Sequence, residues 1–265
     1  MRQNKKIGQI FVSVSIIKKE LNLINFENKT VLEIGAGDGR LTELLALKAK
    51  KVISIEKDRK YCEVLKRKFE KNKKVVILCG DFLKFPPRKV DLIIGNVPYY
   101  ISSEILFHLR FFQFEKAVLM FQKEFVQKVI AKEGELNYCF LSIISQIYFK
   151  INTHFFVDKT NFTPKPKVDS IVVSFEKNMD INKKTEEMLN YFFQHKKKTL
   201  KNALIDSYKN LKINKNEVLS FANALENKNK RVFKLTKEEL LDISKKVLIW
   251  QKKFFLIGEK KKENY

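Results

Sequence analysis

The tetrapeptide Asn96-Val97-Pro98-Tyr99 places a side-chain amide, a rigid ring and an aromatic face within four residues. An exocyclic adenine amine is a weak nucleophile, because its lone pair is delocalised into the ring. The Asn96 side-chain oxygen and a neighbouring backbone carbonyl can accept both hydrogens of such an amine, which frees the lone pair for attack. Pro98 fixes the backbone so that these groups converge, and Tyr99 offers a face for base stacking. The tetrapeptide predicts methyl transfer to an adenine amine by positioning rather than by a strong base.

A glycine-rich turn and an acidic strand end predict a nucleoside site beside this tetrapeptide. Gly35, Gly37 and Gly39 follow a short apolar strand, where open α/β sheets bind ligands and glycine lets the backbone approach them. Glu56 ends the next predicted strand, and an acidic side chain there can accept hydrogen bonds from both ribose hydroxyls. On these residues alone, both NAD and S-adenosylmethionine remain possible.

The end of the third predicted strand adds a polar and an aromatic group. Asp81 follows Gly80 there, and its carboxylate can accept a hydrogen bond from an adenine amino group. Phe82 can then lie against the adenine ring. A solvated turn would also explain a lone aspartate in a loop.

Strands and helices alternate through the first two thirds of the chain, which predicts a mostly parallel sheet covered on both faces. No helical pattern separates the last two strands, so one of them is expected as an antiparallel edge strand. After a polar stretch at 176–187, helical periodicity predicts a small helical domain. The expected strands are 31–34, 52–55, 75–79, 90–94, 116–121, 147–157 and 170–175, and the later helices are 187–194, 198–209, 215–225 and 236–250.

The charge balance favours a polyanionic partner. The chain carries 53 lysine and arginine residues against 30 aspartate and glutamate residues, a net charge of +23. Such an excess is typical of nucleic-acid binding, although a lysine-rich proteome would also produce it. Apolar stretches stay well short of the roughly 20 residues that span a bilayer, and no signal-peptide core is present. We therefore expect a cytoplasmic protein without a membrane segment.

The cysteines and histidines do not follow a metal-binding pattern. Cys62, Cys79 and Cys139 are far apart, and the three histidines are scattered. We expect reduced thiols and no metal site.

Taken together, these segments resemble the ribosomal RNA small-subunit adenine dimethyltransferase family, of the KsgA type. The resemblance rests on the tetrapeptide, the GAGDG turn after Glu33, and the acidic strand ends. It extends to the segment GQIFV at 8–12, the loop FTPKPKVDS at 162–170 and the basic segment QHKKKTLKN at 194–202. These match the family in order over nearly the whole chain. The resemblance implies a Rossmann-like class I S-adenosylmethionine-dependent methyltransferase fold.

The resemblance also implies a substrate and a set of functional residues. The substrate would be two adjacent adenosines in the 3′-terminal hairpin loop of small-subunit RNA, each dimethylated at N6, in ribosome biogenesis. The expected catalytic residues are Asn96, Val97, Pro98, Tyr99 and Phe162, with Tyr99 and Phe162 sandwiching the target adenine. The expected S-adenosylmethionine contacts are Gln9, Ile10, Val12, Gly35, Gly37, Glu56, Lys57, Asp81, Phe82 and Asn96. The expected RNA contacts are Lys196, Lys197, Lys198 and Lys201.

Two positions depart from the family pattern. Ile10 stands where asparagine or histidine is usual, which removes a side-chain hydrogen bond. Tyr100 stands where asparagine is frequent and would narrow the target pocket.

The predicted domains are a catalytic domain at 1–178, a helical RNA-binding domain at 179–257 and a disordered basic tail at 258–265. We expect a monomer whose partner is small-subunit RNA or the assembling subunit. Two alternatives remain: a large-subunit RNA adenine methyltransferase of the macrolide-resistance type, and a non-catalytic assembly factor that only binds RNA.

Overall fold

The computed structural model describes residues 11–262, with side chains up to residue 254. The chain divides into two compact units. The sheet unit consists of residues up to 127 together with 149–178, and the helical unit consists of 128–148 together with the residues from 179 onward.

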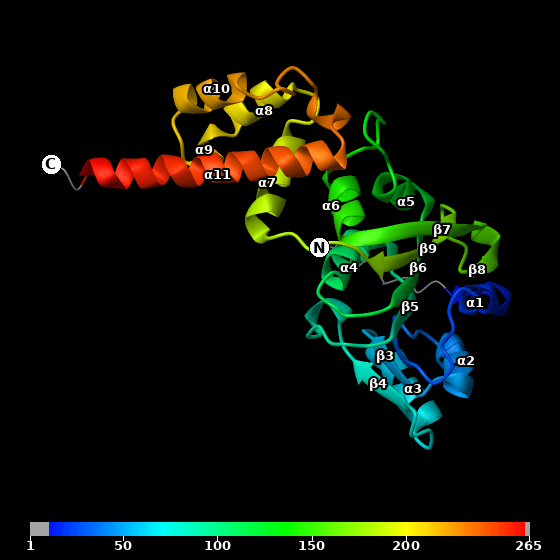
Figure 1. Cartoon of the computed structure of the whole chain (residues 1–265). Coiled ribbons are helices and arrows are strands. Elements are labelled where there is room, and N and C mark those ends of the chain that lie inside the picture. Colours follow the sequence, from blue (N-terminus) through cyan, green and yellow to red (C-terminus); the bar gives the residue numbers. More distant parts are fainter. Residues whose placement is uncertain (1–10, 263–265) are drawn as a thin grey trace, which may run out of the picture. The chain divides into compact units, whose positions relative to one another are not determined.

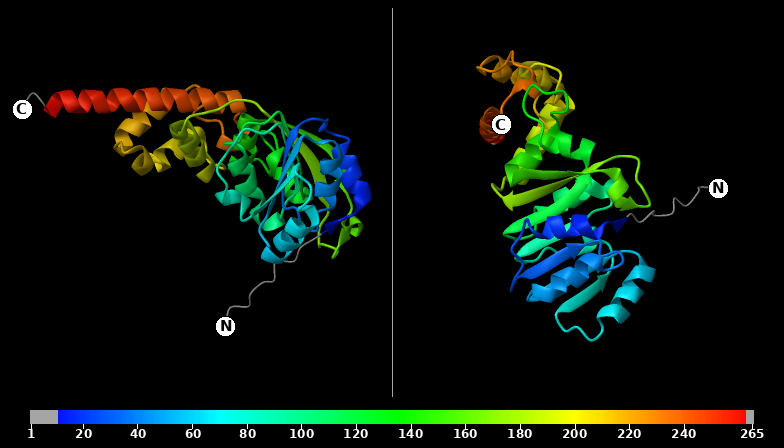
Figure 2. Two further views of the ribbon diagram at one scale, coloured as in Figure 1. Left: turned by 90° about the horizontal axis from the view of Figure 1, so that it is seen from below. Right: turned by 90° about the vertical axis from the view of Figure 1, so that its right-hand side faces the viewer.

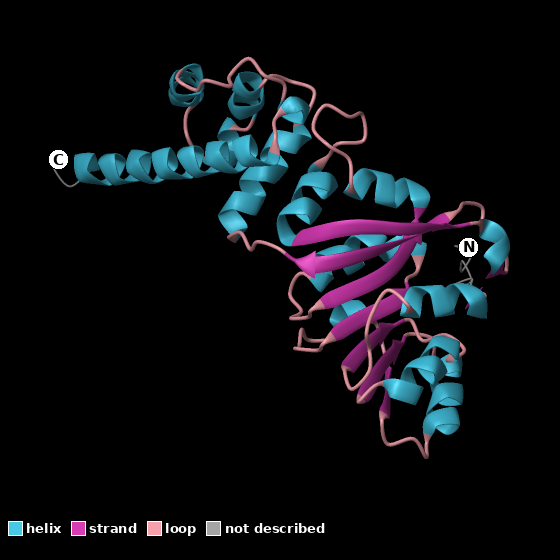
Figure 3. Cartoon of the chain, turned by 45° about the vertical axis from the view of Figure 1, so that its right-hand side comes forward, coloured by secondary structure: helices cyan, strands magenta, loops and turns pink. Residues whose placement is uncertain are grey.

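A sheet forms the centre of the sheet unit (Figure 3). It has seven strands in the order β4-β3-β2-β5-β6-β9-β7. The first five strands in this order are parallel, and their apolar sequences suit a sheet that is buried on both faces. The strands are β2 (Thr30–Ile34), β3 (Lys51–Glu56), β4 (Val75–Cys79), β5 (Leu92–Asn96), β6 (Lys116–Gln122), β7 (Phe149–Val157) and β9 (Ser170–Lys177).

The last two strands complete the sheet through antiparallel pairings, in which β9 runs opposite to all the others and β7 runs in the direction of β6. β9 pairs antiparallel with β6, in a register that places Met120 opposite Val172. β7 pairs antiparallel with β9 and forms the edge. The predicted parallel sheet with an antiparallel edge is therefore confirmed, and the insertion of β9 between β6 and β7 completes the order.

Helices flank both faces of this sheet. Figure 1 shows α1 (Val14–Leu21) and α2 (Arg40–Lys48) on one side and α4 (Ser102–Leu109) on the other. A further helix, α3, consists of Arg59–Phe69. Ile16 from α1 and Leu45 from α2 pack with Val118 of β6 in one buried apolar cluster. This packing fixes the strand ends from which the candidate residues project.

A small second sheet lies in the same unit and was not expected from the sequence. β1 (Phe11–Val12) pairs antiparallel with β8 (Phe162–Thr163), so two segments about 150 residues apart in the chain lie side by side. Two residues per strand are too few for an alternating pattern to be recognised in a sequence.

The helical unit contains a long helix, α11, with shorter helices beside it (Figure 2). Asn182, Thr199 and Asn214 cap the starts of α7, α8 and α10, each accepting a hydrogen bond from a backbone N–H group of the first turn. The helices that follow β6 are α5 (Lys123–Val129), α6 (Phe140–Tyr148), α7 (Lys183–Gln194), α8 (Leu200–Asp206), α9 (Tyr208–Leu211), α10 (Lys215–Asn223) and α11 (Lys237–Lys262).

The helical unit differs from our expectation in three ways. It includes residues 128–148, where α6 contacts α7, although this segment lies inside the predicted catalytic domain. The expected strand at 147–157 begins two residues later, because α6 is apolar enough to resemble a buried strand. α11 continues to Lys262, through residues 258–262 of the expected disordered tail, because lysine and glutamate favour helices. Residues 263–265 lie outside the described residues.

The cysteines also differ from our expectation. Cys62 on α3 and Cys79 at the end of β4 form a disulfide, with their Cα atoms 5.7 Å apart. α3 packs against β4, which brings these two residues together. Cys139 is a free thiol, as expected. Within residues 11–262, no helix has the length and apolar character needed to cross a membrane.

Candidate functional site

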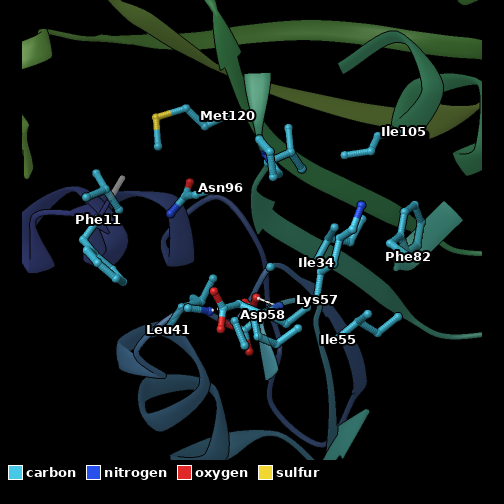
Figure 4. Close-up of a pocket in the computed structure, with 18 of the residues that line it drawn as sticks. Phe11, Ile34, Leu41, Ile55, Lys57, Asp58, Phe82, Asn96, Ile105 and Met120 are labelled. Carbon is cyan, nitrogen blue, oxygen red and sulfur yellow. Dashed lines mark hydrogen bonds between the residues drawn. The ribbon is translucent and has the colours of Figure 1, made fainter. Parts of the chain in front are cut away.

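A cavity of about 310 Å³ opens at the carboxyl ends of the parallel strands in the sheet unit (Figure 4). Its wall takes residues from the ends of β2, β3, β4 and β5, and from the β1–β8 pair. Of the residues predicted for catalysis and cofactor binding, those that line it are Val12, Gly35, Gly37, Glu56, Lys57, Asp81, Phe82, Asn96, Val97, Pro98, Tyr99 and Phe162. Gln9 and Ile10 lie outside the described residues.

The turn between β2 and α2 needs glycine for its backbone shape. Gly37 has φ +55°, in the left-handed region that side chains disfavour. A Cβ atom there would lie 3.2 Å from the Phe11 ring, so the turn and the β1 segment approach closely. The turn thus presents bare backbone to the cavity.

Glu56 is fixed by the backbone around it. Its two carboxylate oxygens accept hydrogen bonds of 2.8 Å, one from the Gly37 N–H and one from the Asp58 N–H. The residue is 5% exposed. These two bonds fix the carboxylate at the cavity wall, where carboxylate oxygens can accept hydroxyl groups of a ligand.

Asp81 is held at the cavity by two donors. Its carboxylate accepts hydrogen bonds from the Lys57 ammonium group, at 2.7 Å, and from the Leu83 N–H, at 3.1 Å. Burial alone would raise the pKa of Asp81, but these donors outweigh burial and lower it. The positive charge of Lys57 therefore balances the negative charge of Asp81. Asp81 stays ionised and can accept a further hydrogen bond.

Phe82 forms an apolar wall next to Asp81. The ring is 4% exposed and stacks on Phe112, with 5.3 Å between the ring centroids. Figure 4 shows it on the side of the cavity opposite Phe11. A flat heterocycle beside Asp81 would meet this ring.

Asn96 ends β5 and carries a polar atom without a partner. Its side-chain oxygen Oδ1 is buried and accepts no hydrogen bond from any described residue. Buried acceptors are normally satisfied, so this oxygen is ready for a ligand donor. Pro98, at φ −60°, then turns the chain into a short 3-10 helix at Tyr99–Ile101.

Tyr99 and Phe162 add two rings to the same cavity. The Tyr99 hydroxyl shares a hydrogen bond of 2.8 Å with the Ser170 hydroxyl, which fixes the phenol ring. Burial raises the pKa of Tyr99, with the Ser170 hydrogen bond opposing it, so the phenol stays neutral near pH 7. Phe162 is 6% exposed, and its strand pairing with Val12 ties the late loop to the N-terminal segment.

The four predicted RNA-binding lysines lie in the helical unit and differ in their partners. The Lys196 ammonium group donates to the backbone oxygens of Leu136 and Tyr138, and Lys198 pairs with Asp206 at 2.6 Å. Among the described residues, Lys197 and Lys201 have no side-chain partner. These two cations are therefore available to an external anion.

Sequence analysis missed two residues that the structure brings to the site. Met120 and Ile105 line the cavity, but apolar residues on a strand and a helix do not stand out from core residues. Sequence analysis also did not single out Glu20, a carboxyl group on the apolar face of α1 that is 1% exposed and lies outside the cavity lining.

The arrangement suits a nucleoside cofactor with a flat base. The fixed Glu56 carboxylate can accept ribose hydroxyl groups, and the Asp81 carboxylate beside the Phe82 ring suits an amino-substituted base. The turn between β2 and α2 presents bare backbone to the cavity. The unsatisfied Asn96 oxygen suits an amine donor. Within residues 11–254, no group of three histidine, cysteine, aspartate or glutamate residues is arranged to hold a metal ion.

Comparisons with known proteins agree with this chemistry. The family model described as ribosomal RNA adenine dimethylase matches residues 2–248. The probable ribosomal RNA small subunit methyltransferase A of Thermococcus sibiricus is 38% identical over 253 residues, covering 92% of this chain and 91% of the relative. The ribosomal RNA small subunit methyltransferase A of Mesomycoplasma hyopneumoniae is 41% identical over 212 residues, covering 76% and 81%.

Solved structures show the same likeness. A dimethyladenosine transferase from Plasmodium falciparum superimposes with a TM-score of 0.78 at 30% identity, covering 92% of this chain and 98% of that one. The 23S rRNA methyltransferase ErmE superimposes with a TM-score of 0.66 at 23% identity, covering 89% and 99%, which is a likeness of fold.

Proposed function

The chain belongs to the ribosomal RNA adenine dimethylase family, and from this premise we propose that it dimethylates N6 of two adjacent adenosines in the 3′-terminal hairpin loop of small-subunit ribosomal RNA. Its cofactor is S-adenosylmethionine, as in the methyltransferases whose fold it shares. The observation that carries the proposal is the buried Asn96 oxygen without a partner at the end of β5.

In the proposed mechanism, Asn96 positions the target amine for attack. Its free oxygen accepts one N6 hydrogen of the target adenine, and a backbone carbonyl of the tetrapeptide accepts the other. These bonds turn the nitrogen lone pair away from the ring and toward the methyl donor. S-Adenosylmethionine supplies an already activated methyl group on a sulfonium centre. The chain therefore needs to position the amine rather than to remove a proton from it before attack.

Glu56 and Asp81 hold the cofactor in the proposal. Glu56 accepts hydrogen bonds from the two ribose hydroxyls, because its carboxylate is fixed by two backbone N–H groups. Asp81 accepts a hydrogen bond from the adenine amino group, and Phe82 contacts the ring. Lys57 supports Asp81. Gly35 and Gly37 allow close approach at the turn, and Val12 closes the apolar wall.

Tyr99 and Phe162 hold the target base on its two faces. A base stacked in a helix cannot reach a cavity of this kind, so the adenosine must come from a loop or be flipped out. Stacking on an aromatic ring contributes about 1–3 kcal/mol per base. The hydrogen bond to Ser170 keeps the Tyr99 ring in one orientation.

The RNA is expected to bind the helical unit as well. Residues 177–265 hold 22 basic and 11 acidic residues, an excess that suits a phosphate backbone. We assign phosphate contacts first to Lys197 and Lys201, and second to Lys196 and Lys198, which already have partners within the chain. In this scheme the sheet unit carries out the transfer and the helical unit binds RNA.

The proposal is tested by incubating the purified protein and S-adenosylmethionine with undermethylated small subunits and mapping the modified bases. Two N6,N6-dimethyladenosines in the 3′-terminal hairpin are expected. Methylation of large-subunit RNA instead would favour the macrolide-resistance alternative, and RNA binding without cofactor consumption would favour the assembly factor. The relatives that cover most of the chain are named for the small subunit, which is why we propose that substrate. We further propose that the protein is a monomer, which light scattering would test. We also propose that it acts in the cytoplasm, which cell fractionation would test.

A further inference from the structure

A second cavity lies wholly within the helical unit and takes no part in the proposed transfer chemistry. Its volume is about 540 Å³, a size common among ligand sites. One wall comes from the C-terminal end of α7 and the lysine segment that follows it, and the other from Cys139 and Phe140, where α6 begins. α6 packs against α7 (Figure 1), so two parts of the unit meet around this cavity.

Contacts within the helical unit hold these walls in place. The Lys196 ammonium group donates to the backbone oxygens of Tyr138, at 2.8 Å, and Leu136, at 3.2 Å. The Tyr138 ring packs edge-on against Phe193, with 5.4 Å between the ring centroids. The segment before α6 is thereby tied to the end of α7. A ligand that enters the cavity does not have to order its walls, which favours binding.

Lys197 gives the cavity a positive charge that is available to a ligand. Of the three consecutive lysines that line it, Lys196 donates to backbone oxygens and Lys198 pairs with Asp206 at 2.6 Å. Lys197 is exposed, and among the described residues no carboxylate pairs with it. An ammonium group in this position suits a phosphate of a nucleic-acid chain.

Two amides and an aromatic ring line the same cavity. Asn190 and Gln194 are four residues apart on α7 and therefore share one face of the helix. Both are exposed, and among the described residues neither side-chain amide has a hydrogen-bond partner. An amide offers a donor and an acceptor side by side, which matches the edge of a nucleic-acid base. Phe140 is half-buried and supplies a ring on which a base can stack.

We propose that this cavity binds one unstacked nucleotide of the substrate RNA. Lys197 contacts its phosphate, Phe140 stacks on its base, and the Asn190 and Gln194 amides bond to the base edge. The proposal rests on the proposed function, because the RNA is the one that is methylated. The nucleotide is not the target adenosine, which enters the cavity of the sheet unit. Base contacts add sequence recognition to the helical unit, whereas lysines alone would accept any RNA phosphate.

The test uses variants that remove the base contacts and leave the lysines intact. Phe140→Leu keeps an apolar side chain without a flat ring, and Asn190→Ala combined with Gln194→Ala removes both amides. The matched controls are Tyr191→Leu, a half-buried ring on α7, and Asn210→Ala, an exposed amide on α9; neither residue lines the cavity. Thermal unfolding and S-adenosylmethionine affinity are measured for each variant.

Two measurements on undermethylated small subunits follow. Methyl-transfer kinetics give kcat and the KM for subunits. Chemical probing with dimethyl sulfate and a carbodiimide, which modify unpaired bases, shows which bases the bound protein protects.

We expect the KM for subunits to rise about 5- to 10-fold in Phe140→Leu, because leucine retains only part of the stacking energy. The double amide variant should raise KM about 3- to 10-fold, as expected for lost hydrogen bonds. In both, kcat and cofactor affinity should change less than about twofold. The wild type and both controls should protect one unpaired base, besides the two target adenosines, that becomes reactive in Phe140→Leu and in the double amide variant.

The proposal is overturned if folded Phe140→Leu and the folded double amide variant keep the wild-type KM and protection pattern. It is also overturned if KM rises without any base losing protection, since the cavity would then hold a phosphate or a protein segment and read no base. Should Phe140→Leu fail to fold, the double amide variant decides, because both of its positions are exposed. If the wild type binds subunits and protects this base but methylates no adenosine, the proposed function fails and the nucleotide site stands.

Discussion

Replacing Glu56 by alanine should weaken S-adenosylmethionine binding about 30-fold. The carboxylate is 5% exposed and held by the Gly37 and Asp58 N–H groups, each at 2.8 Å. It is thus already oriented toward a ribose, and a ligand loses little freedom in meeting it. Hydrogen bonds to charged groups each contribute about 1.5–3 kcal/mol. Water entering the emptied space would offset part of two such bonds and leave about 2 kcal/mol, which corresponds to the stated change in Kd.

Titration calorimetry measures this change directly. Glu56→Gln should weaken binding as well, because its NH₂ group must face one of two backbone N–H donors. Glu115→Gln is a suitable control, since Glu115 pairs with Lys29 on the surface and does not line the cavity. Unchanged affinity in a folded Glu56→Ala protein would remove this carboxylate from the cofactor site and refute the reasoning.

Three further predictions concern the base, the RNA and stability. Tyr99→Phe loses the hydrogen bond to Ser170, worth about 0.5–1.5 kcal/mol, so single-turnover transfer should fall no more than about tenfold; complete inactivity would show that the hydroxyl does chemistry. Neutralising Lys197 and Lys201 should lower the salt slope of RNA binding by about 1.4–1.8, and an unchanged slope would exclude phosphate contacts there. Burial raises the pKa of Glu33 to about 7, so the folded state keeps a proton that the unfolded chain loses, and stability falls as pH rises from about 4.5 to 7. Glu33→Gln should lack this fall. Denaturant unfolding of both proteins at pH 5 and pH 7.5 measures it, and an equal change in the free energy of unfolding between the two pH values in both proteins would contradict the prediction.

The strands of the sheet could be predicted from the sequence because apolar runs and glycine turns act locally. The expected strand at 75–79 is β4, and the expected strand at 116–121 lies within β6. The end of each parallel strand then falls at one edge of the sheet, which is why Glu56 and Asn96 could be assigned to one site.

Features that depend on contacts between distant segments could not be predicted. The pairing of Phe162 with Val12, and the Tyr99–Ser170 hydrogen bond, join residues 150 and 71 positions apart. The Cys62–Cys79 disulfide depends on how α3 packs against β4, and no sequence spacing encodes that. The burial of Glu20 did leave a trace in the sequence, as a charged residue at an apolar position of α1.

The lysine segment shows a second limit of sequence analysis. Four lysines close together in the chain are equivalent in a sequence, whereas the fold gives Lys196 two backbone oxygens and Lys198 a carboxylate. A charge excess predicts a polyanionic partner but not which cations remain available to it.

The central claim is that the Asn96 oxygen prepares an adenine amine of small-subunit RNA for methyl transfer, and single-turnover transfer by Asn96→Ala tests it most directly. The measurement uses undermethylated small subunits, saturating S-adenosylmethionine and mapping of the modified bases. The account predicts dimethylation of two adjacent adenosines by the wild-type protein. For Asn96→Ala it predicts a rate about 10²- to 10³-fold lower, with an unchanged fold. A folded Asn96→Ala protein that transfers methyl groups at the wild-type rate would contradict the account.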